Sequence, residues 1–330
     1  MPKRKRQTDV LFEPVMLSKA MKQADEVVRL VAPKDVTLTL IGESGVGKEV
    51  LARRAHELSS RRSGPFVPIN CAAIPEALFE SELFGHERGA FTGATHLARG
   101  KIEAATGGTL FMDEVGELPL SQQAKLLRFL ESRRFMRVGG TTKISADVRL
   151  MFATLRPLEQ EVKAGLFRPD LFYRIQGITL RVPPLRERRE DIGALLTLFI
   201  AQLSAQHGVE PPRLTREVKT LLLGYDWPGN ARELRNVAET LCLLRSGRVV
   251  RKVNLPESIR ALDSSHRLAS AAGSLVVDPA DGLETVTRQV VEAVLERVGG
   301  NKLRAAAILQ ISPRTIQRYV AAGRVTAPRA

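Results

Sequence analysis

The glycine-rich segment GESGVGKE, residues 42–49, has the spacing of a phosphate-binding loop. Its glycines, Gly42, Gly45 and Gly47, permit backbone conformations that other residues avoid, so successive N–H groups can point inward and bind phosphate at the start of a helix. Lys48 would then neutralise the β and γ phosphates of a nucleotide. We expect the remaining loop residues to line the nucleotide as well: Glu43, Ser44, Val46 and Glu49.

An acidic pair supplies metal and water chemistry that this loop lacks. Glu49 stands where the general loop has a Ser or Thr that holds magnesium, so a metal would need other ligands. In GGTLFMDE, residues 107–114, an apolar run ends at Asp113 and Glu114. Asp113 suits Mg²⁺, directly or through water, and Glu114 suits orienting or deprotonating an attacking water. Such a pair is otherwise a solvated turn, and the phosphate loop favours the catalytic interpretation.

The elements that must position these residues follow one repeating pattern, a short apolar run, a turn and a helix-period segment. This pattern predicts an α/β fold with a parallel sheet covered by helices on both faces. Three of the runs end at polar residues, Asn70, Asp113 and Thr154, and parallel strands bind ligands beyond their carboxyl ends, so these three should converge on one crevice. The predicted strands cover residues 36–41, 66–69, 109–112, 148–154 and 178–182.

Beyond the Pro-Pro pair at 183–184, helical periodicity replaces the strands. It runs through 191–208 and through an apolar stripe at Leu234, Val237, Leu241 and Leu244. We therefore delimit five parts: a basic tail, an α/β nucleotide-binding subdomain, a helical subdomain, an Ala/Ser/Gly-rich linker and a C-terminal domain. In that order they span residues 1–13, 14–185, 186–258, 259–281 and 282–330.

The C-terminal domain has the pattern of three helices. Gly299 and Gly300 end the first, Asn301 caps the second, and Ser312 caps the third with Pro313 at its first position. A tight turn between the last two helices describes a helix-turn-helix. Residues 297–330 hold seven basic side chains and no acidic one, and the whole chain carries a net charge of +14 with pI near 10.3. Both properties favour a polyanionic partner such as nucleic acid or anionic lipid.

Cysteine usage and hydropathy indicate a cytoplasmic protein. Cys71 and Cys242 lie far apart, with no Cys-x-x-Cys pair, so neither a disulfide framework nor a zinc site is indicated. No apolar stretch approaches the eighteen or so residues of a membrane span, and no apolar segment follows the basic start MPKRKRQTD. We expect no membrane partner.

The segment ELFGHERGAFTGA, residues 82–94, resembles the NtrC-type enhancer-binding activators of sigma-54 RNA polymerase, a branch of the AAA+ ATPases. The hexapeptide Gly89-Ala90-Phe91-Thr92-Gly93-Ala94 is the hallmark loop of that family. Similarity runs from about residue 10 to 250 and from about 283 to 320. It implies an AAA+ sheet with a helical lid, ATP and Mg²⁺ held between subunits of a ring, usually a hexamer, and a loop that hydrolysis moves against sigma-54.

Within that loop, the resemblance implies that Phe91 and Thr92 contact the sigma factor. The residues agree with this, because glycines at both ends permit a mobile hairpin and an exposed Phe is costly unless a partner covers it. Without the resemblance, the residues favour the interpretation of Phe91 as a buried anchor of the loop.

The resemblance assigns further roles residue by residue. Asn70 would hold the catalytic Glu114 in its resting orientation. Arg168 and Arg174, in FRPDLFYRI at 167–175, would reach the nucleotide of the neighbouring subunit, where a planar guanidinium can stabilise the transferring phosphoryl group. Arg232, in WPGNARELRN at 227–236, would reach the nucleotide from the lid of its own subunit.

One position departs from the family pattern. The first sensor commonly reads Ala-Thr-Asn, whereas residues 153–155 are Ala-Thr-Leu. A Leu side chain cannot hydrogen-bond phosphate or water, so either Thr154 suffices or hydrolysis is slowed.

The segment GGNKLRAAAILQISPRTIQRYV resembles the Fis-type helix-turn-helix of these activators. The last helix would enter the major groove of double-stranded DNA, with Ile316 and Val320 packed inward. The residues expected to face DNA are Arg314, Thr315, Gln317 and Arg318.

The resemblance predicts an ATP-hydrolysing activator that binds upstream enhancer DNA and remodels sigma-54 RNA polymerase holoenzyme for open-complex formation. A DNA-binding regulator whose AAA+ domain hydrolyses weakly and serves nucleotide-dependent assembly is the alternative, and another kind of AAA+ remodelling machine is disfavoured by the hallmark loop. Similarity begins within fifteen residues of the start, which leaves no room for a receiver domain. We therefore expect control by a separate regulatory protein, by expression level or by a heteromeric ring.

Overall fold

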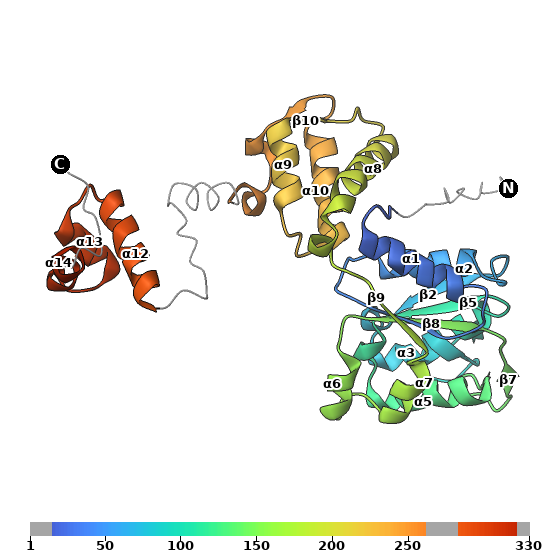
Figure 1. The fold of residues 1–330 in the computed structure, drawn as a ribbon. Coiled ribbons are helices and arrows are strands. Elements are labelled where there is room, and N and C mark those ends of the chain that lie inside the picture. The colour runs from blue at the N-terminus through green and yellow to red at the C-terminus, as the bar shows by residue number, and fades with distance from the viewer. Residues whose placement is uncertain (1–14, 262–282, 322–330) are drawn as a thin grey trace. The chain divides into compact units, whose positions relative to one another are not determined.

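The computed structural model describes residues 15–261 and 283–321, so the basic tail and most of the linker expected from the sequence lie outside the described residues. The chain divides into two compact units, Met1–Pro256 and Glu257–Ala330, each of which is described by itself (Figure 1). Over the described ranges, no helix has the length and apolar character needed to cross a membrane.

The first unit is built on a five-stranded parallel sheet with strand order β2-β5-β8-β1-β9. All five strands predicted from the sequence are confirmed, with ends shifted by at most two residues. Every residue of β8 is buried, because helices cover both faces of the sheet. The strands are β1 (Leu38–Ile41), β2 (Phe66–Asn70), β5 (Thr109–Asp113), β8 (Arg149–Thr154) and β9 (Ile178–Arg181).

Alternating side chains of the central strands fill two separate apolar cores. Leu110 and Met112 of β5 join the core under α3, α5 and α7, whereas Phe111 joins the core under α1 and α2. This alternation follows from the two-residue period of a strand. Figure 1 shows the two sets of helices on opposite sides of the sheet. Their bounds are α1 (Lys19–Val31), α2 (Lys48–Glu57), α3 (Glu76–Phe84), α5 (Leu120–Ser132) and α7 (Pro169–Ile175).

Two short hairpins form separate two-stranded sheets beside the five-stranded one. Antiparallel β3 (Gly85–His86) and β4 (Ala98–Arg99) carry the loop 87–97, and antiparallel β6 (Arg134–Phe135) and β7 (Ile144–Ser145) carry the loop 136–143. The sequence did not predict these two-residue strands. Short helical segments complete the subdomain: η1 (Cys71–Ala73), α4 (Lys101–Ala104), η2 (Val115–Glu117) and α6 (Leu158–Lys163).

The helical subdomain expected after residue 185 is present. Trp227 is 0% exposed and its Nε1 donates to the carbonyl of Leu222, which fixes the turn before α10. Leu234, Val237 and Leu241 are buried as the stripe predicts, but Leu244 is exposed, because α10 ends there. The elements are η3 (Leu185–Glu187), α8 (Arg189–His207), β10 (Arg213–Leu214), α9 (Arg216–Gly224), α10 (Asn230–Leu244), β11 (Val249–Val250) and η4 (Lys252–Asn254).

The second unit contains the three predicted C-terminal helices, α12 (Leu283–Arg297), α13 (Lys302–Leu309) and α14 (Pro313–Ala321). The predicted caps are confirmed: the Asn301 side chain accepts from two backbone N–H groups of α13, and Ser312 Oγ accepts from Thr315 N. A small core of Val291, Leu295 and Ile316 with two alanines joins the helices. A further helical segment covers residues 257–261 and so extends into the range that the sequence assigned to the linker.

Candidate nucleotide-binding site

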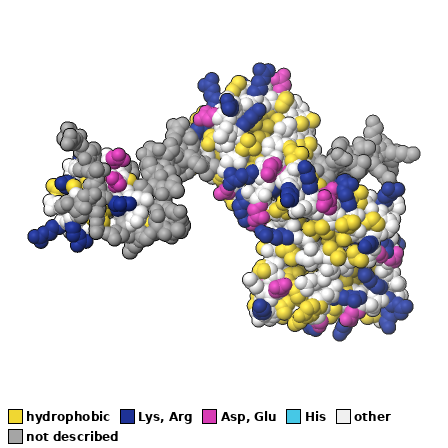
Figure 2. Space-filling model, in the orientation of Figure 1, with side chains coloured by type: hydrophobic (Ala, Val, Ile, Leu, Met, Phe, Trp, Pro, Cys, Tyr) yellow, Lys and Arg dark blue, Asp and Glu magenta, His cyan; other side chains and the backbone are white. Residues whose placement is uncertain are grey.

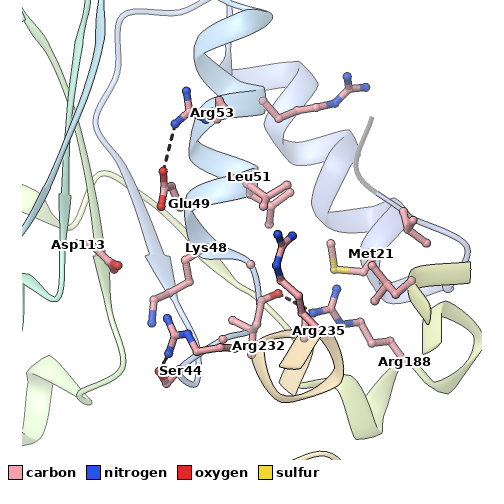
Figure 3. A pocket seen from close by; sticks show the side chains of 18 of the residues that line it. Met21, Ser44, Lys48, Glu49, Leu51, Arg53, Asp113, Arg188, Arg232 and Arg235 are labelled. Carbon is pink, nitrogen blue, oxygen red and sulfur yellow. Dashed lines mark hydrogen bonds and ion pairs between the residues drawn. The ribbon is translucent and has the colours of Figure 1, made fainter. Parts of the chain in front are cut away.

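A cleft of about 550 Å³ lies in the first unit, between the loop after β1, helix α2 and the helical subdomain. This volume falls within the range of small-molecule sites. Figure 3 shows Lys48 and Asp113 on the sheet side of the cleft, with Arg188, Arg232 and Arg235 reaching in from the other side. Of the eight loop residues predicted at 42–49, the last six line the cleft.

The glycine loop takes the conformation that its composition predicts. Gly45 and Gly47 have φ angles of 76° and 99°, in the left-handed region, and α2 begins at Lys48 directly after them. A Cβ atom on Gly45 would lie 2.6 Å from the carbonyl oxygen of Gly229 in the helical subdomain. Gly45 is therefore needed both for its backbone angles and for the close approach of the two subdomains.

Lys48 and Glu114 form an ion pair inside the cleft. Lys48 is 6% exposed, and its Nζ donates to Glu114 Oε1 at 3.0 Å and to the carbonyl of Gly42 at 2.9 Å. The other carboxylate oxygen, Oε2, accepts the backbone N–H of Leu155 at 3.0 Å. Glu114 itself has φ 54° and ψ 47°, a left-handed conformation unusual for a non-glycine residue. Lys48 at the start of α2 and the backbone N–H of Leu155 directly after β8 thus fix the orientation of this acid.

Asp113 occupies the last position of β5 and is partly buried beside Glu114. Burial first, and then the negative charge of Glu114, raise the pKa of the Asp113 carboxyl, while Lys48 opposes them. A divalent cation would relieve this repulsion, so the donor set fits Mg²⁺, which usually takes one or two carboxylates with phosphate and water oxygens. Over residues 15–261 and 283–321, no group of three or more His, Cys, Asp or Glu side chains is placed to hold a metal ion.

The strand ends bring Asn70 and Thr154 to the same edge as Asp113, as predicted. Asn70 pairs in register with Asp113, and Thr154 with Ile41. Their side chains, however, bond locally: Asn70 Oδ1 accepts Ala72 N at 3.0 Å, and the Thr154 hydroxyl accepts Arg156 N at 3.0 Å. The role of Asn70 in orienting Glu114 stays a prediction, and the hydrogen-bond partners of the Glu114 carboxylate in this structure include Lys48 and the Leu155 N–H. Sequence reasoning missed the Leu155 N–H because a backbone donor leaves no mark in residue type.

Asn230, which sequence reasoning did not select, joins the loop to the helical subdomain. It is fully buried with φ 53°. Its Nδ2 donates to Glu43 Oε2 at 3.1 Å and to the Ser44 carbonyl at 3.0 Å, and its Oδ1 accepts Leu185 N at 2.8 Å. Three segments of the first unit therefore meet at one side-chain amide.

Two further contacts cross between the subdomains. Arg232 Nη1 donates to Ser44 Oγ at 2.6 Å, which brings the predicted lid arginine to the phosphate loop. Arg186 binds both carboxylate oxygens of Glu43 at 2.6 and 2.9 Å, and this guanidinium, aided by Asn230, holds the pKa of Glu43 at about 2. Glu43 thus faces the helical subdomain rather than lining the cleft.

The far end of the cleft is apolar with arginines around it. Met21, Leu195 and Phe199 line it, and the Arg235 guanidinium lies 5.8 Å from the Phe199 ring centre. Arg188 is buried and donates to the Val46 carbonyl at 2.6 Å, while its Nε has no partner. Sequence reasoning did not predict these residues either, because apolar and arginine side chains from separate segments form no recognisable sequence motif.

The two arginines expected to act on a neighbouring nucleotide lie away from this cleft. Arg168 forms a two-point pair with Asp170 at 3.1 and 2.7 Å, and Arg174 donates to the Leu130 carbonyl at 3.2 Å. Neither lines the cleft of its own chain.

The glycine-flanked loop 89–94 forms a tight surface turn. Gly89 N donates to the Ala94 carbonyl, and Ala94 N to the Phe91 carbonyl. Gly89 and Gly93 have φ of 83° and 103°, and a Cβ at either would have open space around it. Phe91 is 41% exposed and packs edge-on against His86 at 4.9 Å. The interpretation of Phe91 as a buried anchor is therefore wrong.

The neighbouring hairpin supports the base of this turn. Arg137 pairs with Glu87 and with Glu103, each at 2.8 Å. Glu87 N donates to the Val138 carbonyl, and Val138 N to that of Gly85. The loop tip is consequently exposed while its base is fixed.

In the second unit, α14 exposes most of the residues predicted to face DNA. Arg314, Gln317 and Arg318 are exposed, and Ile316 is buried. Thr315 is half-buried, and its Oγ1 lies 2.8 Å from Ser312 Oγ, so it takes part in the helix cap. Figure 2 shows Lys and Arg side chains prominent on the visible face of this unit.

The loop, the acidic strand end and the helical lid define a P-loop nucleotide-binding protein of the AAA+ class. Three family models match the chain: the Sigma-54 interaction domain over residues 15–181, the AAA+ ATPase lid domain over 186–272, and the bacterial regulatory protein, Fis family, over 282–318. The first covers half of the chain. The chain therefore belongs to the sigma-54 activator family and carries a Fis-type helix-turn-helix.

Relatives and solved structures agree with this family. The chain is 42% identical over 305 residues to the regulatory protein AtoC of Escherichia coli, covering 91% of this chain and 65% of AtoC. It is 40% identical over 311 residues to the transcriptional regulatory protein FlbD of Caulobacter vibrioides, covering 92% and 68%. NtrX from Brucella abortus, crystallised in complex with ATP, matches with a TM-score of 0.70 and 35% identity, covering 94% of this chain and 69% of NtrX. The chain thus spans about two thirds of the length of these relatives.

Proposed function

We propose that this protein is an ATP-hydrolysing transcription activator that acts on sigma-54 RNA polymerase holoenzyme from upstream DNA. The observation that carries the proposal is the arrangement of Lys48, Glu114 and the Leu155 N–H at one glycine loop. Transfer of a phosphoryl group to water needs a lysine that neutralises the phosphate and an acid that orients and deprotonates the water. It also needs a hydrogen-bond donor that holds the acid in place. ATP-bound NtrX supports ATP as the nucleotide.

In this proposal the glycine loop and Lys48 bind the β and γ phosphates, and Arg232 contacts them from the lid. Mg²⁺ held at Asp113 would neutralise charge on the phosphates. Glu114 orients the attacking water and accepts its proton. The apolar end of the cleft, with Met21 and Phe199, receives the adenine, since flat apolar walls favour an aromatic base.

Arg168 and Arg174 act on the nucleotide of a neighbouring subunit, which makes the active form a ring, in this family usually a hexamer. Neither arginine lines the cleft of its own chain. A guanidinium can stabilise phosphoryl transfer only next to the phosphate, so the phosphate on which these arginines act belongs to another subunit. Asp170 shields Arg168 until a neighbour is present.

The turn 89–94 is the surface that engages sigma-54, through Phe91 and Thr92. Phe91 is exposed at the tip of the turn, where a partner protein can cover it, while the Arg137–Glu87 ion pair holds the base of the turn in place. This arrangement supports a reversible contact with sigma-54. α14 binds double-stranded DNA through Arg314, Gln317 and Arg318, and the net charge of +14 adds non-specific attraction. We assign the protein to the cytoplasm on this function.

A second candidate is favoured by one observation, the leucine at the first sensor. The Leu155 side chain is exposed and has no polar atom to offer the phosphate or water. A regulator that binds ATP for assembly but hydrolyses it slowly would suit this residue.

The decisive experiment measures sigma-54 binding by the purified full-length chain with an ATP transition-state analogue. We expect binding with the analogue, its loss in Thr92→Ala, and ATP turnover that disappears in Lys48→Ala. Binding with turnover below the background of Lys48→Ala would support the second candidate. Absence of sigma-54 binding in every nucleotide state would refute the activator function.

A further inference from the structure

A buried glutamine on α5, Gln123, joins two segments of the first unit, one that follows Glu114 and one that leads into Arg168. The Gln123 side chain is 0% exposed. Its Nε2 donates to the carbonyl oxygens of Leu118 at 2.7 Å and Leu166 at 3.1 Å, and its Oε1 accepts the backbone N–H of Arg168 at 2.8 Å. Both amide hydrogens and the amide oxygen are therefore in use.

The contacts fix the orientation of the amide. If the nitrogen and oxygen were exchanged, the oxygen would face two carbonyl oxygens, and the nitrogen would face an N–H donor. Among the uncharged side chains, only glutamine carries two N–H donors and one acceptor oxygen at this distance from the backbone. An apolar residue here would leave three main-chain groups without partners.

The first of these segments belongs to the catalytic acid of the same subunit. Glu114 is the N-cap residue of the short helix η2, and Leu118 is its C-cap residue. The Leu118 side chain is buried in the core beneath α5. The second segment ends at Arg168, the N-cap residue directly before α7. One side chain thus links the segment that follows the acid of the subunit's own cleft to the backbone of the arginine proposed for its neighbour.

We propose that Gln123 is a positioning residue for the arginine that acts in the neighbouring site. This inference rests on the proposed function, in which Arg168 reaches the phosphates of the next subunit. Gln123 sets the place where the Arg168 backbone enters α7, and so sets the reach of the guanidinium. It does not line the cleft of its own chain, so its loss should leave nucleotide binding there intact.

The docking of α7 as a whole does not depend on this glutamine. Leu171, Phe172 and Ile175 of α7 pack in the apolar core beside Leu126 and Phe129 of α5. Arg174 is held separately, at the carbonyl of Leu130. Loss of the Gln123 hydrogen bonds should therefore misdirect Arg168 without releasing the helix that follows it.

The first test compares the same substitution at adjacent positions in the full-length protein. Gln123→Met removes all three hydrogen bonds at similar side-chain volume. Gln122→Met is the matched control, because Gln122 is also buried on α5 and its carbonyl oxygen has no partner. We expect Gln123→Met to lower kcat for ATP tenfold or more with KM within twofold, and Gln122→Met to leave both within twofold.

The second test separates a misdirected arginine from a damaged subunit. Glu114→Gln subunits cannot hydrolyse ATP but retain an intact Arg168. Mixed 1:1 with Gln123→Met subunits, they should place a functional arginine beside half of the intact acids, so turnover per Gln123→Met subunit rises toward half the unmodified value. Arg168→Ala subunits mixed with Glu114→Gln calibrate this restoration. Gln123→Met mixed with Arg168→Ala should show none, because both lack the arginine.

The outcomes distinguish the neighbouring-subunit role of Arg168 from the positioning role of Gln123. If the calibrating pair shows no restoration, the neighbouring-subunit role of Arg168 fails, and this inference fails with it. If the calibrating pair is restored but the Gln123→Met pair is not, the glutamine acts within its own subunit and only the inference is overturned. Should Gln123→Met fail to fold, Gln123→Lys, which keeps donors for the Leu118 and Leu166 carbonyl oxygens but removes the acceptor for the Arg168 N–H, takes its place in the same mixtures.

Discussion

Replacement of Asn230 by alanine should detach the helical subdomain from the phosphate loop. The change removes hydrogen bonds to Leu185, Ser44 and Glu43, and each such bond contributes about 1 kcal/mol net. Alanine at a φ of 53° adds roughly 1 kcal/mol of backbone strain. We therefore expect the free energy of unfolding to fall by about 4 kcal/mol in Asn230→Ala and about 3 kcal/mol in Asn230→Gly, which tolerates the backbone angle.

The protein carries its own reporter for this measurement. Trp227 is the single tryptophan, is fully buried, and lies three residues before Asn230 in the same turn. Urea unfolding followed by its fluorescence reports the helical subdomain directly. Asn236→Ala, at an exposed position on the same helix, is the control and should change stability by at most about 0.5 kcal/mol.

Two results would refute the reasoning on Asn230. Alanine and glycine variants of equal stability would show that the left-handed backbone angle carries no strain. A loss below about 1 kcal/mol in both would show that the three hydrogen bonds are replaced by water once the side chain is removed. The KM for ATP should rise in both variants, since the Ser44 carbonyl and the loop around it lose their support.

Two further predictions concern the first sensor and the DNA-binding helix. Leu155→Asn should raise ATP turnover less than tenfold, because the backbone N–H that orients Glu114 remains in the variant, and a larger rise would show that the leucine limits hydrolysis. Arg314→Ala should weaken binding to target DNA by about 1–3 kcal/mol if it reads a base, or lower the salt slope by about 1 if it binds phosphate. Lys219→Ala, which removes the same charge from an exposed helix of the other unit, should do neither.

The sequence predicted what depends on periodicity and on motif chemistry. The five strands, the lid and the capped C-terminal helices follow from local patterns, and the structure confirms them. The contacts within the site depend on the meeting of distant segments. Asn230 and Glu43 are 187 residues apart, and nothing near either one in the sequence indicates their hydrogen bond. Leu155 shows the same limit of sequence-based prediction. Its apolar side chain suggested slowed hydrolysis, whereas its backbone N–H donates the hydrogen bond to Glu114.

The two partners of Glu114 suggest how ATP binding prepares the acid. Lys48 is paired with Glu114 at 3.0 Å, and in the proposed function the γ phosphate of ATP would be a stronger anionic partner for the same lysine. Exchange of one anion for another leaves the buried ammonium paired, so the change avoids the cost of an isolated charge. Glu114 then retains only the Leu155 N–H and has one carboxylate oxygen available for water. In the proposed function, Lys48 would thereby release Glu114 only when a phosphate is present for water to attack.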